Sequence, residues 1–186
     1  MLGFGDAAEE ALLATFRDIM AVAVEVDDGV SFDIKGLRIE AIREELEYGG
    51  SRLRTTGALA GARIPITVDI GFGDAVEPGV ENIDLPVLLD LPSPHLRAYP
   101  IETVLAEKFH AMVVLGRANS RMKDYYDVWM LTSTFELEPA RMRLAIAATF
   151  ARRGTLIPTA VPDGLSPTFA ADPAASHGAR YWPCKR

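Results

Sequence analysis

The sequence is poor in the residues that crosslink proteins or hold zinc. Its 186 residues include one cysteine, Cys184, and three histidines. A single cysteine excludes a disulfide within the chain and fits a reducing, cytoplasmic setting. None of the histidines has zinc-ligand spacing with another histidine or with Cys184, so the sequence does not predict a zinc site.

Long apolar runs are also missing. No window approaches roughly 18 uninterrupted apolar residues, and no basic flank precedes an apolar core at the N-terminus. The sequence therefore predicts neither a membrane span nor a secretion signal, and no membrane partner. Hydrophobic residues make up 49% of the chain and charged residues 24%, which is typical of a globular protein with one core.

Positive charge is in deficit, since the formal net charge is −7. This balance argues against a protein that coats nucleic acid without specificity. Basic residues nevertheless outnumber acidic ones, seven to four, between Arg117 and Gly154. That basic region fits a phosphate-bearing ligand, and a solvated helix face explains it equally well. The sequence has no GxxxxGK[ST] loop, and no Ser-His-Asp or Cys-His set is predicted.

Hydrophobic periodicity changes along the chain from strand-like to helix-like, which predicts an α+β fold. The pattern divides the chain into a sheet domain over 1–98, a helical region over 99–154 and a tail over 155–186. That tail is expected to be irregular or disordered, because it holds five of the twelve prolines and no sustained period. The expected elements are a helix capped by Asp6, strands over 22–26, 37–44, 51–59 and 64–72, and helices that begin near Pro100, near Asn119 or Ser120, and near Pro139.

Asp69 is the first residue that suggests chemistry. Alternation directs Ile64, Ile66, Val68 and Ile70 to one face of a strand and places Asp69 on the other. A carboxylate held on a strand suits Mg²⁺, which takes one or two carboxylates together with phosphate oxygens. The alternative is an exposed or salt-bridged aspartate on the open face of an antiparallel sheet, and periodicity alone favours that alternative.

Lys108, Asp124 and Asp127 form a second set of candidates. Lys108 falls on the apolar stripe of its predicted helix, so its amine must reach the surface, pair with a carboxylate or contact a ligand phosphate. Asp124 and Asp127 share one face of the next helix, where they could bind a cation or hold Arg117 or Arg121. Lys123 is expected to pair with Asp127 at helical spacing.

Two segments resemble motifs of the AbiEii/AbiGii family of nucleotidyltransferase toxins. The strand IPITVDIGFGD (64–74) is similar to the third motif of that family, and AEKFHAMVVLGRANSRMKDYYDVWML (106–131) is similar to the fourth. The resemblance implies a polymerase-β-like nucleotidyltransferase fold, with a mixed sheet followed by a helical region. It implies transfer of NMP from an NTP, with GTP and CTP as candidates, to RNA, with the tRNA acceptor end as target in some relatives.

The resemblance also implies the roles of the candidate residues. Asp69 is expected to be a catalytic residue that binds Mg²⁺, and Lys108 to be catalytic and to contact the nucleotide phosphates. Asp124 is expected to be the essential acidic residue of the last motif, with Asp127 as a nucleotide-binding neighbour. Two-metal phosphoryl chemistry uses carboxylates and a lysine in these ways. A cognate antitoxin encoded nearby is the expected protein partner.

The sequence departs from the family near its N-terminus. It carries neither the Gly-Ser helix start nor the Asp-x-Asp strand that supplies two metal carboxylates. We therefore expect a sheet that is incomplete at the N-terminus and a chain that is truncated and inactive. The alternatives are a non-catalytic remnant or binding module that contacts an antitoxin, and a generic α+β protein with a structural Lys108–Asp124 ion pair.

Overall fold

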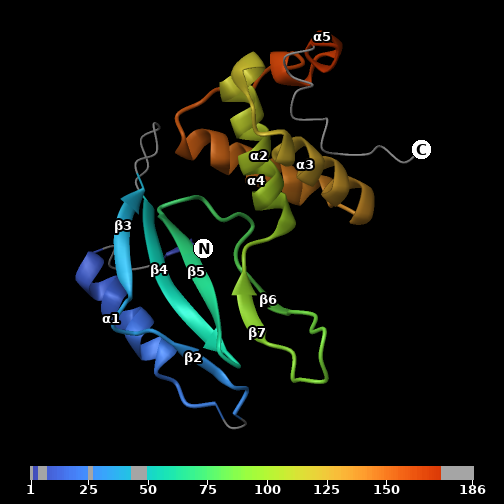
Figure 1. The fold of residues 1–186 in the computed structure, drawn as a ribbon. Helices are drawn as coiled ribbons and strands as arrows, with labels where there is room; N and C mark the ends of the chain where they lie inside the picture. Colours follow the sequence, from blue (N-terminus) through green and yellow to red (C-terminus); the bar gives the residue numbers. More distant parts are fainter. Residues whose placement is uncertain (1, 4–7, 25–26, 43–49, 173–186) are drawn as a thin grey trace. The chain divides into compact units, whose positions relative to one another are not determined.

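The computed structural model describes residues 2–3, 8–24, 27–42 and 50–172 of the chain. The chain consists of two compact units, Met1–Asp74 and Ala75–Arg186. A five-stranded sheet with one helix forms the first, and a short hairpin followed by helices forms the second (Figure 1). The predicted α+β class is confirmed, whereas the functional division at residues 98 and 154 stays a prediction.

The sheet of the first unit is built around one long hairpin. Strands β4 (Gly50–Leu59) and β5 (Ala62–Phe72) pair antiparallel and are joined at Ala60 and Gly61. Both joining residues have positive φ, 48° and 85°, as a tight two-residue hairpin turn requires. This turn fixes the register that places Arg52 opposite Asp69.

Three short strands complete the sheet. Strand β1 (Leu2–Gly3) runs parallel to the end of β5, so the rest of that edge of β5 has no paired strand among the described residues, in agreement with Pro65. Strand β2 (Val30–Phe32) pairs with the last residues of β4, and β3 (Arg38–Ile42) pairs with its first residues. The two therefore follow one another along the same edge of β4.

Helix α1 (Glu9–Met20) covers one face of this sheet. Its buried residues Leu12 and Phe16 pack with Leu53 and Ile70, which point to the same face from neighbouring strands. Leu53 and Ile70 are almost fully buried, as the predicted alternation requires. The opposite face of the sheet, which carries Asp69, is therefore the polar one.

Two predictions for the N-terminal third are wrong. Residues 22–24 do not form a strand, and Val22 and Val24 are 70% and 58% exposed, because no strand in the described part of the chain pairs with them. Residues 25–26 of that expected strand lie outside the described residues. Helix α1 has Ala8, not Asp6, at its N-cap; Asp6 itself also lies outside the described residues.

The second unit begins with a hairpin that the periodicity does not predict. Strands β6 (Glu81–Asp84) and β7 (His95–Ala98) pair antiparallel and are only four residues each. The elements that follow are α2 (Ile101–Leu115), the short 3-10 helix η1 (Gly116–Ala118), α3 (Met122–Thr134), α4 (Pro139–Arg152), the 3-10 helix η2 (Asp163–Leu165) and α5 (Pro167–Ala170).

Helices α2 and α4 form the core of this unit. Phe150 of α4 is fully buried and contacts the rings of Phe109 and His110 on α2. Apolar spacing predicts a core face of α3 made of Met122, Tyr125, Tyr126, Trp129 and Met130, and this prediction is wrong in large part. Tyr126 and Trp129 are exposed, Trp129 by 63%, because α3 meets α2 along its other side.

The first part of the proline-rich tail is ordered against the helices. Phe169 is buried and stacks on Tyr125 with 5.6 Å between ring centroids. Arg117 forms an ion pair with Asp172 at 3.0 Å. Two prolines begin or precede the short helices here, so the lack of apolar periodicity hides local order. Among the described residues, no helix is long and apolar enough to cross a membrane.

Candidate functional site

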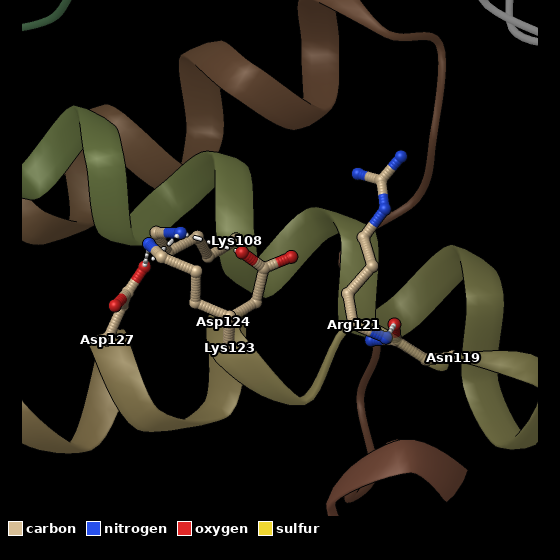
Figure 2. A network of polar contacts seen from close by, with 6 residues as sticks. All are labelled: Lys108, Asn119, Arg121, Lys123, Asp124 and Asp127. Carbon is tan, nitrogen blue, oxygen red and sulfur yellow. Dashed lines mark hydrogen bonds and ion pairs between the residues drawn. The ribbon is translucent and has the colours of Figure 1, made fainter. Parts of the chain in front are cut away.

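Lys108 lies between two carboxylates in the second unit. Its Nζ is 2.7 Å from Oδ1 of Asp124 and 2.9 Å from Oδ2 of Asp127 (Figure 2). The exposed fractions of the Lys108, Asp124 and Asp127 side chains are 19%, 17% and 17%. Lys123 reaches the same Asp127 oxygen at 2.7 Å from the solvent side, as its helical spacing predicts. The cluster of two lysines and two aspartates is therefore electrically neutral.

The local sequence explains how the cluster forms. Lys108 lies on α2 among buried residues, and the spacing of three between Asp124 and Asp127 turns both carboxylates toward it from α3. The chain reverses between the helices at Asn119, which is buried and whose Oδ1 accepts a hydrogen bond from the Arg121 N–H at 2.9 Å. Arg121 itself, not Asn119 or Ser120, is at the N-cap of α3.

Burial and pairing act in opposite directions on Lys108. Burial lowers the pKa of its ammonium, but hydrogen bonds to Asp124 and Asp127 outweigh burial and raise the pKa above its usual value. The hydrogen bonds from Lys108 and Lys123 hold the pKa of Asp127 below its usual range. Lys108 and Asp127 are therefore both charged at neutral pH, and the ammonium is fixed in place with a third N–H to offer.

Asp69 has a different environment in the first unit. Its two carboxylate oxygens accept hydrogen bonds from Nε and Nη2 of Arg52, at 2.6 Å and 2.8 Å. This bidentate pair lowers the pKa of Asp69 and raises that of Arg52. Both side chains are partly exposed on the open face of the sheet, which matches the salt-bridged alternative that the alternation favours.

The surroundings of Asp69 do not fit a magnesium site. Mg²⁺ would have to bind beside a guanidinium cation that is already held against both carboxylate oxygens. Within the described part of the chain, no group of three or more His, Cys, Asp or Glu side chains is arranged to hold a metal ion. The metal-binding role of Asp69 therefore stays a prediction from the motif resemblance.

The structure brings three of the four predicted site residues together. Lys108, Asp124 and Asp127 meet in the second unit, and Asp69 belongs to the first. Neither arginine that could have paired with the aspartates does so: Arg117 binds Asp172, and Figure 2 shows Arg121 directed away from the cluster.

Sequence reasoning missed three groups of polar contacts, and the first is the pair of Arg52 with Asp69. Arg52 is predictable in principle, because a two-residue turn fixes which residue faces Asp69. The second network joins Arg141 of α4 to Glu102 of α2 at 2.9 Å and to Glu81 of β6, and it ties the hairpin to the helices. The hydrogen bonds from Arg141 lower the pKa of Glu102. No local spacing signals this network, because its members are far apart in sequence.

A third missed group surrounds His110. Its Nε2 lies 3.0 Å from Oγ1 of Thr155, whose hydroxyl already donates to the Arg153 carbonyl, so Nε2 must carry the proton and donate. Nδ1 accepts from the Arg153 guanidinium at 3.4 Å. Burial and the charge of Arg153 lower the pKa of His110 below its usual value of 6.5. The folded chain therefore favours the neutral imidazole.

This preference predicts a pH-dependent stability. Because the pKa of His110 is lower in the folded chain than in the unfolded chain, its contribution is complete above about pH 6.5 and is lost as the pH falls through the folded pKa. We expect urea unfolding between pH 7.5 and pH 5 to show a slope of at most about 1.4 kcal/mol per pH unit from this residue. His110→Gln should remove that slope and leave the curve above pH 7.5 parallel to that of the wild type. An unchanged slope would contradict the assignment.

Comparison with known proteins identifies one family. Residues 1–181 match the family described as the nucleotidyl transferase AbiEii toxin of a type IV TA system. No curated protein and no solved structure matches the chain. The matched span covers the first compact unit, residues 75–181 of the second, and the segments that carry Asp69, Lys108 and Asp124.

Proposed function

Since the chain belongs to the AbiEii family of nucleotidyl transferase toxins, we propose that its helical unit binds an NTP through Lys108. The observation that supports this most directly is the ammonium of Lys108, held by Asp124 and Asp127 on two helices. A fixed ammonium with one N–H still to offer can contact a phosphate oxygen without first ordering a flexible side chain. Asp124 and Asp127 then act by holding Lys108 in place.

The finer roles follow the motif match. The reaction class is the transfer of NMP from an NTP, with GTP and CTP as candidates, to RNA, with the tRNA acceptor end as the candidate target. The family generally uses a divalent metal, and the motif resemblance assigns Asp69 to it, but the bidentate contact of Asp69 with Arg52 does not fit that role. We propose that this chain by itself is inactive in transfer, because its sequence lacks the Asp-x-Asp motif and Asp69 is bound to Arg52.

A transfer and binding assay tests this proposal. The chain is incubated with Mg²⁺, labelled NTPs and tRNA, and NTP binding is measured in parallel by calorimetry. We expect NTP binding without label incorporation, and at least tenfold weaker binding in Lys108→Met. Lys123→Met is the matched control: it removes the same charge beside Asp127 from an exposed position and should change affinity less than threefold.

Two outcomes would contradict the proposal. Label incorporation by the wild type that stops in Asp124→Asn would show that the chain is active. Equal NTP affinity in Lys108→Met and the wild type would show that Lys108 does not contact the nucleotide.

We propose the cognate antitoxin encoded nearby as the protein partner. The connection between β6 and β7 supports a protein contact in this unit, because contiguous exposed leucines are typical of interaction surfaces. The exposed leucines of this connection are Leu85, Leu88, Leu89 and Leu91.

A further inference from the structure

The open face of the first unit carries an ordered row of charges. Antiparallel register places Asp69 of β5 opposite Arg52 of β4, and Arg52 opposite Glu40 of β3. In the next row Arg54 is opposite Arg38. All five side chains belong to the face that α1 does not cover. These five described side chains, three arginines and two carboxylates, carry a net positive charge, although the whole chain has a net charge of −7.

A carboxylate orients Arg52, and a second carboxylate lies near Arg54. Arg52 donates to Asp69 from Nε and Nη2, which leaves its Nη1 edge for another acceptor, and its side chain is 36% exposed. Nε of Arg54 lies 3.5 Å from Glu40, and its side chain is 44% exposed. Because Arg52 is held by two hydrogen bonds, its guanidinium loses little rotamer entropy when it binds a second anion.

Arg38 and Arg54 give an independent reason to expect an anion. Like charges directly opposite each other on neighbouring strands destabilise a sheet. Glu40 forms an ion pair with Arg54, while the described residues offer Arg38 no ion pair. An anion bound beside these arginines would remove their repulsion, and phosphate matches the geometry of the guanidinium fork.

From these observations we infer that Arg52 and Arg54 form a phosphate-binding site on the open face of the sheet, which binds its ligand without a metal ion. Asp69 in this site holds the guanidinium of Arg52 and does not bind Mg²⁺. The phosphates belong either to an NTP or to the backbone of RNA, and both present the same oxygens to the arginines. This inference rests on the proposed function only for its two candidate ligands, NTP and RNA. It does not depend on a transfer reaction, because phosphate binding requires none.

Binding in EDTA tests the inference directly. Inorganic tripolyphosphate and a 5′-hydroxyl oligoribonucleotide are titrated into the full chain, in EDTA and in Mg²⁺. We expect at least one probe to bind as tightly in EDTA as in Mg²⁺, and Arg52→Gln and Arg54→Gln each to weaken that binding about tenfold. Arg17→Gln is the charge-matched control, since Arg17 is exposed on α1 at the other face, and it should change affinity less than twofold.

The outcomes distinguish an NTP from RNA as the source of the phosphate. They also distinguish this inference from the proposed NTP binding by Lys108. Loss of tripolyphosphate binding in the Arg52 and Arg54 variants assigns the site to an NTP, and loss of oligoribonucleotide binding assigns it to RNA. Binding that requires Mg²⁺, no binding of either probe, or equal effects of Arg17→Gln and Arg52→Gln would overturn the inference. If Lys108→Met weakens NTP binding while Arg52→Gln and Arg54→Gln change neither probe, the proposed function stands and this inference fails.

Discussion

Lys108→Met destabilises the second unit by about 2 kcal/mol. The substitution leaves Asp124 and Asp127 close together on a largely buried face, where two carboxylates without the ammonium repel each other and lack their strongest donor. Trp129 on α3 belongs to this unit, so its fluorescence during urea unfolding reports the stability of the unit.

The triple variant Lys108→Met/Asp124→Asn/Asp127→Asn should recover most of this loss. Replacing a whole ion cluster by neutral groups of similar size is often nearly neutral, whereas removing one partner leaves the others unpaired. We expect the triple variant to lie within about 1 kcal/mol of the wild type. A triple variant as unstable as Lys108→Met alone would mean that side-chain packing of Lys108, and not its charge, carries the stability.

Phe150→Ala costs about 3 to 4 kcal/mol, the largest effect that we expect from one substitution. Phe150 is fully buried, and its ring contacts Phe109 and His110, so its removal leaves a cavity between α2 and α4. Because α2 also carries Lys108, the cavity loosens the helix that positions the ammonium. The same urea titration measures the loss.

Leu144→Ala is the control for this prediction. Leu144 lies on the same helix α4 but is more than half exposed, so its truncation should change stability by less than about 0.5 kcal/mol. Equal effects of the two substitutions would contradict the packing of α2 against α4 as the core of the unit.

Residue patterns predict those parts of the fold that depend on local periodicity. Alternation places Ile70 in the core and Asp69 on the open face, and the two-residue turn then determines that Arg52 faces Asp69. The strands β6 and β7 are too short for any alternation to stand out, and Arg141 of α4, which pairs with Glu81 of β6, is distant in sequence.

Apolar periodicity on α3 misleads for a physical reason. Spacing shows that Tyr126 and Trp129 share a face, but burial depends on which side of the helix a neighbour covers. Similarly, spacing places Asp124 and Asp127 together, whereas their contact with Lys108 depends on the turn at Asn119. The sequence therefore indicates the Lys108–Asp124 and Lys123–Asp127 ion pairs, whereas the second contact of Lys108, with Asp127, follows only from the structure.

NTP binding by the triple variant tests most directly whether the Lys108 cluster serves the nucleotide or only the fold. Calorimetric titration compares this variant with the wild type under conditions in which both are folded. If the cluster contacts the nucleotide, the triple variant keeps its stability and loses at least tenfold in affinity. Wild-type affinity in a stable triple variant would show that Lys108, Asp124 and Asp127 form a structural ion cluster and nothing more.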